Sequence, residues 1–170
     1  MITGRNAERG AIAAREIAEA HGIWAHFLQA DFGNVENCRM VVAETDRLFG
    51  RLDVLVNVGA STARGTIIDT TPETFDLLFN TNVRGPYFLM QEAIKLMIAK
   101  GIQGAICNIG SISALAGQPF INAYCASKGA LTTLTALVLQ GQSYTLAHVG
   151  DTRLWRLHGD DLQLLTQDHA

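Results

Sequence analysis

Short apolar runs alternate with longer segments of helical periodicity over roughly the first 130 of 170 residues, and this alternation limits the possible folds most strongly. Strands are predicted around 1–3, 23–29, 53–58 and 105–109, and helices over 7–21, 34–48, from 72, over 87–100 and from 123. The run Asp53–Val58 (DVLVNV) is typical of a strand buried on both faces. The order predicts an α/β protein with a doubly wound parallel sheet, whose ligand lies beyond the carboxyl ends of the strands.

Capping residues place the ends of the predicted helices. Asn6 and Asn34 each precede a helical segment and can accept a hydrogen bond from its first turn. Gly22, Gly50 and Gly101 follow helical segments, where a left-handed residue ends a helix.

Composition excludes several classes of protein. A net charge of −3 argues against a nucleic-acid partner. No apolar run reaches the ~18–20 residues of a membrane helix, and the start, MITGRNAERG, lacks the apolar region of a signal peptide, so we expect no membrane association and a cytoplasmic location. Three cysteines without metal-ligand spacing are expected to be reduced core thiols: Cys38, Cys107 and Cys125.

A serine, a tyrosine and a lysine between residues 108 and 128 suggest proton-transfer chemistry. Tyr124 and Lys128 are four residues apart, so a helix places them on one face, where an ammonium favours the phenolate form of a tyrosine. Such a tyrosine is a usable general acid or base. Ser111 follows an apolar strand, where its hydroxyl could hold a substrate oxygen. Taken alone, the Tyr-x-x-x-Lys spacing is equally consistent with a surface helix pair.

The same residues resemble the short-chain dehydrogenase/reductase family over about residues 1–133. Asp53–Asn57 (DVLVN) matches its strand before the substrate loop, and Asn82, in NVRGPYFLMQ, matches its catalytic asparagine. Ser111, Tyr124 and Lys128 match its serine and Tyr-x-x-x-Lys. The resemblance implies a partial Rossmann-like sheet and hydride transfer between NADP(H) and a small carbonyl or secondary alcohol. It makes Tyr124 the proton donor, Lys128 the holder of the nicotinamide ribose, Ser111 the orienting hydroxyl and Asn82 the support of a relay water.

Three further positions match cofactor contacts of that family. Arg5 stands at the position of the family's ribose-selecting residue, where an arginine favours the 2′-phosphate of NADP. The alternative is an arginine that simply faces solvent, and NAD remains possible as the cofactor. Asp31 matches the residue that contacts the adenine amino group, with a turn-forming aspartate as the alternative. Asn57 matches a structural asparagine. The expected cofactor-binding residues are therefore Arg5, Asp31, Asn57, Tyr124 and Lys128.

The sequence departs from the family at the phosphate-binding end. It has no strand and glycine-rich turn ahead of residue 1, a unit of about 30–35 residues, so the strands that would flank that strand are predicted to have unpaired edges. Gly59 also lies one place earlier than the usual glycine. We therefore expect no measurable turnover from this chain alone.

The last part of the chain has a different pattern of apolar and turn residues. Apolar segments separated by Gly141–Gln142, Gly150–Asp151 and Gly159–Asp160 predict an antiparallel meander over 134–170, a second unit after 1–133. His148–Arg153 (HVGDTR) and Thr166–His169 (TQDH) resemble metal-dependent serine/threonine phosphatases of the 2C type. The chief metal ligands of those enzymes have no counterpart here, and a turn residue is the favoured reading of Asp151.

The two resemblances meet near residues 129–136, and we interpret the chain as a fusion at that point. A phosphatase fragment, and a non-catalytic interaction module, are the alternatives to an oxidoreductase. If the chain is an interaction module, the helices at 87–100 and 123–133 would pair between copies in a homo-oligomer.

Overall fold

Parallel strands and helices alternate along most of the chain, as predicted for an α/β protein. The computed structural model describes residues 1–137, 145–146, 155–158 and 161–164, with side chains described up to residue 134. Its strands are β1 (Ile2–Gly4), β2 (Phe27–Gln29), β3 (Val54–Asn57), β4 (Ala105–Asn108), β5 (Thr145–Leu146), β6 (Trp155–His158) and β7 (Asp161–Leu164). Its helices are α1 (Ala7–His21), α2 (Val35–Phe49), α3 (Pro72–Phe79), the π-helix η1 (Asn80–Arg84), α4 (Gly85–Lys100), the 3₁₀ helix η2 (Ile112–Ala114) and α5 (Asn122–Leu137).

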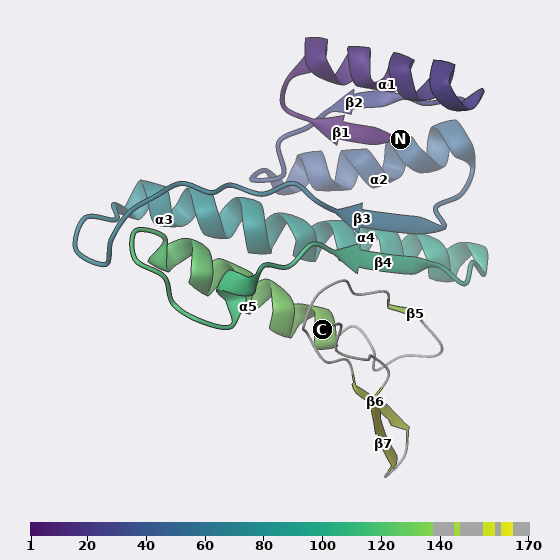
Figure 1. Ribbon diagram of the computed structural model, residues 1–170. Coiled ribbons are helices and arrows are strands. Elements are labelled where there is room, and N and C mark those ends of the chain that lie inside the picture. Colours follow the sequence, from purple (N-terminus) through teal and green to yellow (C-terminus); the bar gives the residue numbers. More distant parts are fainter. Residues whose placement is uncertain (138–144, 147–154, 159–160, 165–170) are drawn as a thin grey trace.

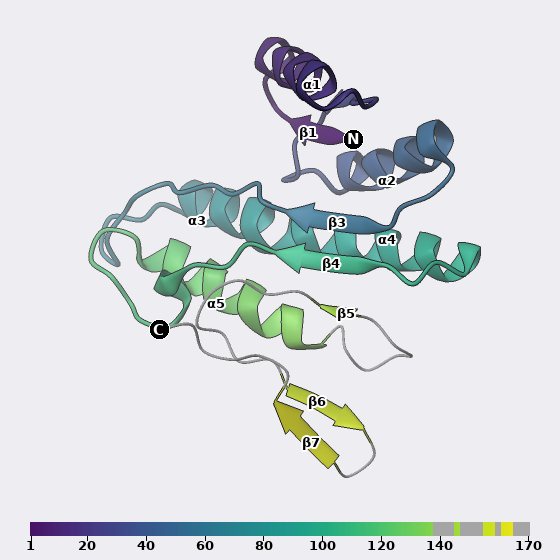
Figure 2. The same ribbon diagram turned by 45° about the vertical axis from the view of Figure 1, so that its right-hand side comes forward.

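The parallel strands form two separate groups. β1 pairs with β2, and β3 pairs with β4, which pairs with β5. The arrows of β1, β3 and β4 point the same way in both ribbon views (Figures 1 and 2), and β2 runs parallel to β1. β1 and β3 are not paired to each other, so the interruption of the sheet lies where the sequence predicts it.

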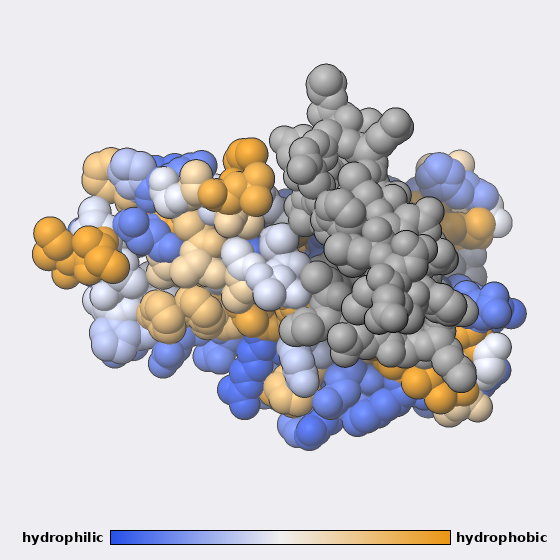
Figure 3. All heavy atoms as spheres, turned by 90° about the horizontal axis from the view of Figure 1, so that it is seen from below, coloured by the Kyte–Doolittle hydropathy of each residue, from blue (hydrophilic) through white to orange (hydrophobic). Residues whose placement is uncertain are grey.

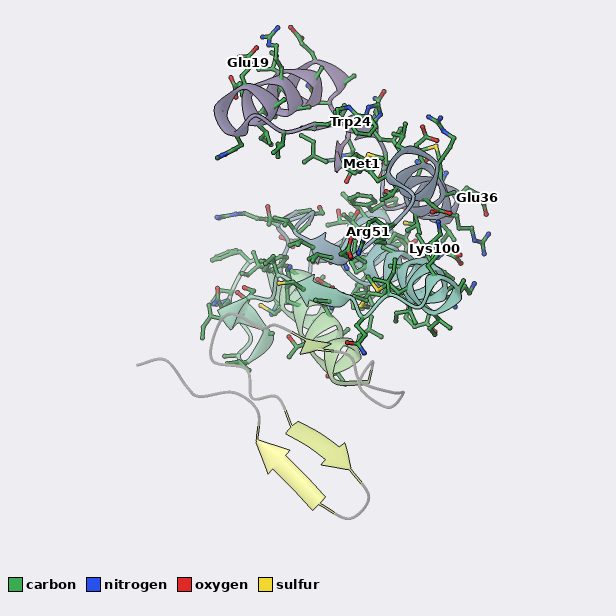
Figure 4. All side chains as sticks on the ribbon, turned by 90° about the vertical axis from the view of Figure 1, so that its right-hand side faces the viewer. Met1, Glu19, Trp24, Glu36, Arg51 and Lys100 are labelled. Carbon is green, nitrogen blue, oxygen red and sulfur yellow. The ribbon has the colours of Figure 1, made fainter. Side chains whose placement is uncertain are left out.

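Helices lie on opposite sides of the sheet. Looking along the strands, α2 and α4 lie on one side of β3, while α1 lies on the other side, beside β1 and β2 (Figure 4). The core between α2, α4 and the strands contains fully or largely buried Ala30, Cys38, Val41, Val42 and Leu89. Burial raises the pKa of the Cys38 thiol to about 11, which keeps it protonated at neutral pH. All three cysteines are free thiols, and Cys38 and Cys125 are buried.

The predicted helix ends are confirmed by their hydrogen bonds. The Asn6 side chain accepts from Arg9 N at 2.8 Å, and the Asn34 side chain accepts from Glu36 N at 2.8 Å. Gly22, Gly50 and Gly101 all have positive φ, the left-handed conformation that ends a helix without strain only at glycine.

Two strand predictions are wrong in extent or burial. β2 covers only Phe27–Gln29 rather than 23–29, because Ile2 pairs with Phe27 and residues 23–25 therefore have no residue of β1 opposite them. β3 is buried on one face only. Val54 and Val56 remain 56% and 51% exposed, since α2 and α4 cover the opposite face.

The meander predicted for the end of the chain is partly confirmed. β6 and β7 form an antiparallel hairpin, but β5 pairs in parallel with β4, so it extends the preceding sheet. Helix α5 continues to Leu137, across the predicted boundary between 133 and 134. The turns at 141–142, 150–151 and 159–160 lie outside the described residues.

Candidate active site

The carboxyl end of β4 carries the first predicted catalytic residue. Ser111 is the cap of η2, and its Oγ accepts a hydrogen bond from Ser113 N at 3.2 Å. This cap needs a short side chain with an acceptor oxygen, which serine supplies. η2 packs against α5, so the structure brings Ser111 to the helix that carries Tyr124 and Lys128.

Tyr124 and Lys128 lie on one face of α5, as their spacing predicts. Lys128 Nζ lies 5.9 Å from the centroid of the Tyr124 ring. The lysine is only 4% exposed, and its Nζ donates to Ile109 O, at the end of β4, over 2.7 Å. Burial lowers the pKa of the Lys128 ammonium from its ordinary value. The bond to Ile109 places the charge between α5 and the strand end.

This burial predicts a pH dependence of stability. The pKa of Lys128 is lower in the folded chain than in the unfolded chain. Between that lowered pKa and about 10.4, the unfolded chain therefore binds more protons than the folded chain. The free energy of unfolding contributed by Lys128 consequently rises with pH over this range. We expect wild type to gain free energy of unfolding relative to Lys128→Met across this range. Urea titration of both proteins at several pH values measures the difference; parallel curves would contradict the expectation.

Asn82 occupies the interior of the π-helix η1 and is 1% exposed. Its Nδ2 donates to Ser61 O and to Ser127 Oγ, both at 2.9 Å, and its Oδ1 accepts from Ser61 N at 2.7 Å. Ser127 Oγ in turn donates to Tyr124 O at 2.7 Å. Asn82 therefore ties the segment after β3 to the helix turn that carries Tyr124.

Sequence reasoning missed Ser127 and Asn108. Ser127 is completely buried between Asn82 and Tyr124. Its position directly before Lys128 in the sequence was the one feature that could have indicated a role in the site. Asn108 Oδ1 accepts from Asn57 Nδ2 at 2.7 Å, and Ile109 N donates to Asn57 O at 3.0 Å. Asn57 thus joins the carboxyl ends of β3 and β4, a cross-strand link that depends on strand pairing.

The other predicted cofactor residues surround a different place. Arg5, Asp31 and Asn57 all line a groove of about 890 Å³ between β1 and β3, near its carboxyl-end rim. Asp31 Oδ1 accepts from Gly33 N at 2.9 Å, so this side chain also forms a turn. Tyr124 and Lys128 do not line the groove, but Asn57 connects the two groups, because Ile109 N donates to Asn57 O and Ile109 O accepts from Lys128 Nζ.

The loops that follow β3 and β4 are joined near α5. Gly65 N donates to Phe120 O at 2.9 Å, and Phe120 has a φ of 64°, a strained value for an aromatic residue. These loops expose apolar side chains, which include Ile67, Ile68, Ile112 and Leu115. Exposed apolar groups are visible at the left-hand end of the face in Figure 3, the end where these loops lie in Figure 1.

The parallel α/β fold agrees with the family that comparison with known proteins finds. A profile described as short chain dehydrogenase matches residues 1–145. The chain belongs to the short chain dehydrogenase family.

Several known proteins are similar to this chain. The 3beta-hydroxysteroid dehydrogenase of Mediterraneibacter gnavus is 35% identical over 139 residues, which cover 81% of this chain and 49% of the relative. The NADP-dependent (R)-specific alcohol dehydrogenase of Lentilactobacillus kefiri is 32% identical over 79% of this chain and 53% of the relative. The structure of a gluconate 5-dehydrogenase from Burkholderia cenocepacia J2315, in complex with NADP and tartrate, has a TM-score of 0.74 at 30% identity, covering 81% of this chain and 53% of that one. The chain spans about half the length of the curated relatives it matches.

The phosphatase-like motifs at 148–153 and 166–169 lie outside the described residues, so that resemblance and the division at 133/134 remain predictions. The described part of the chain holds no group of three or more His, Cys, Asp or Glu residues arranged for a metal ion. In the same part, no helix combines the length and the apolar character that crossing a bilayer requires.

Proposed function

We propose that this chain carries the proton-transfer machinery of an oxidoreductase that moves a hydride between NADP(H) and a small carbonyl or secondary alcohol. The placement of the buried Lys128 ammonium 5.9 Å from the Tyr124 ring, on a helix packed against the Ser111 turn, carries the proposal. A bound nicotinamide cofactor would supply or accept the hydride, which amino-acid side chains cannot do.

Each residue then has a separate task. The Ser111 hydroxyl orients the substrate oxygen, and the Tyr124 hydroxyl gives that oxygen its proton in the reducing direction. The Lys128 ammonium stabilises the phenolate that Tyr124 becomes. Asn82 acts as a positioning residue, because its side chain is committed to Ser61 and Ser127 rather than to the Tyr124 hydroxyl. The exposed apolar loops after β3 and β4 supply the surface for the carbon skeleton of the substrate.

Isotope transfer tests the proposed reaction. Because the sheet is interrupted between β1 and β3, we expect steady-state turnover to be too slow to detect, so the chain is used in excess over each carbonyl of a panel. NADPH carrying deuterium at C4, as the separate pro-R and pro-S forms, supplies the label. We expect mass spectrometry to find deuterium in a product alcohol from one form only. Absence of label throughout the panel, with both forms, would overturn the proposal.

Arg5 supports NADP as the cofactor. Arg5 belongs to the groove lining just after β1, and a guanidinium–phosphate pair contributes roughly 1.5–3 kcal/mol. We expect Arg5→Asp to weaken NADPH binding by about 10–100-fold and NADH binding much less. Titration of nicotinamide fluorescence measures both affinities.

Arg15→Asp is the matched control, since it makes the same charge change on the exposed surface of α1. Equal affinity of wild type for NADPH and NADH would contradict the NADP preference, and tighter binding of NADH would favour NAD.

A further inference from the structure

The segment 112–120, between β4 and α5, exposes apolar residues and covers polar ones. Every exposed residue in it is apolar, a proline or a glycine: Ile112, Leu115, Ala116, Gly117, Pro119 and Phe120. Its polar residues are covered instead, since Ser113 is only 6% exposed and Gln118 is partly buried. Polar side chains are mostly exposed in folded proteins, and a contiguous apolar surface indicates a place where a ligand or partner binds.

Ile112 and Leu115 lie on one side of the turn η2. Leu115 N donates to Ile112 O at 3.1 Å, and a helix with three residues per turn brings the side chains at i and i+3 into line. These side chains are 66% and 59% exposed, although η2 packs against α5. The turn is therefore fixed from its inner side and presents two neighbouring apolar side chains on its outer side.

Phe120 is exposed in spite of a strained backbone. Its φ of 64° lies in the left-handed region, which glycine adopts freely and an aromatic residue does not. A hydrogen bond of 2.9 Å from Gly65 N to Phe120 O holds this carbonyl group in place. The ring is 61% exposed, so burial of the ring does not offset the strain. Strained residues of this kind cluster at sites that contact ligands.

The segment 112–120 connects the two residues that are proposed to contact the reacting oxygen. Ser111 directly precedes it, and Tyr124 follows Phe120 by four residues. Figure 1 shows the segment leaving the end of β4 and returning to the start of α5. The loop after β3 differs from it, because that loop exposes charged side chains, Arg64 and Asp69, beside its apolar ones.

The chemistry of this apolar surface favours one class of carbonyl compound. A hydrocarbon chain or ring gains free energy when it leaves water for such a surface. The hydroxyl groups of a polyhydroxylated carbonyl would lose hydrogen bonds to water there. The exposed side chains of 112–120 carry no donor or acceptor that could replace those bonds.

We propose that the segment 112–120 selects carbonyl compounds with a hydrocarbon substituent over polyhydroxylated ones, with Ile112, Leu115 and Phe120 as the specificity-determining residues. The inference rests on the proposed function, because it places the carbonyl oxygen at Ser111 and Tyr124 and the substituent against the segment. Each methylene group that leaves water on binding is expected to tighten binding by about 2–4-fold.

Nuclear magnetic resonance of methyl groups tests the contact without cofactor or hydride transfer. The full chain, labelled with ¹³C at its isoleucine and leucine methyl groups, is titrated with 2-pentanone, 2-heptanone and 2-nonanone. We expect saturable shifts at Ile112 and Leu115, with a dissociation constant that falls by about 4–16-fold for every two methylenes added. The polar probe, 1,3-dihydroxy-2-propanone, is expected to shift neither residue at the same concentrations.

Ile112→Ser and Ile98→Ser form a matched pair of variants. The two side chains are 66% and 64% exposed, and Ile98 lies near the end of α4. Ile112→Ser is expected to weaken the binding of 2-heptanone, observed at Leu115, by about 3–10-fold, and Ile98→Ser is expected to leave it unchanged. In the isotope-transfer assay, Ile112→Ser is expected to lower the ratio of deuterium in 2-heptanol to deuterium in glycerol by the same factor.

Phe120→Gly separates binding from structure. Glycine adopts the left-handed backbone without strain, so the urea midpoint of this variant is not expected to fall. The affinity for 2-nonanone is expected to fall by about 3–10-fold, because the apolar surface of the ring is lost. A lower urea midpoint with unchanged affinity would show that the ring is structural, and would overturn its assignment to specificity.

Three further results would overturn the proposal. The methyl groups of Ile112 and Leu115 could remain unshifted, or the three ketones could bind equally well. Shifts that grow with the concentration of the chain alone would show that a second copy covers this surface instead. Ketone binding at both residues without deuterium transfer would contradict only the proposed reaction. Deuterium transfer that responds neither to ketone length nor to Ile112→Ser would contradict only this inference.

Discussion

Tyr124→Phe is expected to reduce single-turnover hydride transfer to a carbonyl by about 10²–10⁴-fold, to the level of the uncatalysed background. The substitution removes the hydroxyl that gives the substrate oxygen its proton and leaves the ring beside Lys128 in place. The measurement is deuterium incorporation into the product alcohol at fixed protein excess.

Tyr87→Phe is the matched control for this experiment. Tyr87 lies on α4 and is 46% exposed, and the substitution removes the same hydroxyl from a different helix than α5. Its rate is expected to equal that of wild type. A Tyr124→Phe rate within a few-fold of wild type would exclude the tyrosine as the proton donor.

Asn82→Leu is expected to lower the free energy of unfolding by about 2–4 kcal/mol. Leucine fills a similar volume but supplies none of the three hydrogen bonds that Asn82 makes, so part-buried backbone groups of Ser61 lose their partner. The connection to Ser127, and through it to the Tyr124 carbonyl, is lost as well. Urea unfolding followed by circular dichroism measures the change.

Asn34→Ala is the control for the second prediction. Asn34 is exposed and caps α2 with one hydrogen bond to Glu36 N, so its loss is expected to cost only about 1 kcal/mol. Equal effects of the two substitutions would show that the buried network around Asn82 contributes no more than an ordinary helix cap.

Local patterns were sufficient for the helices. The cap at Asn6 and the left-handed glycine at Gly22 determine α1 from residues within one turn of its ends, and the structure confirms both. The same holds for α2 between Asn34 and Gly50.

Strand burial was less predictable, because it depends on elements far away in sequence. The run Asp53–Val58 is apolar enough for a strand covered on both faces, yet only the side facing α2 and α4 is covered. Its length and parallel pairing were predictable, and its open face was not.

The candidate site divides in the same way. Tyr124 and Lys128 share a helix face because of their spacing, so the sequence was enough to pair them. The contact of Lys128 with Ile109, and that of Asn82 with Ser127 across 45 positions, exist only because β4, η1 and α5 pack together.

The sequence by itself determined the alternation of strands and helices, the helix ends and the family, because each depends on nearby residues or on short motifs. Only the tertiary structure decided that Arg5, Asp31 and Asn57 surround one groove and that two strand edges face it. Strand order and crossover direction bring these groups together, and both depend on which apolar faces pack against each other along the whole chain.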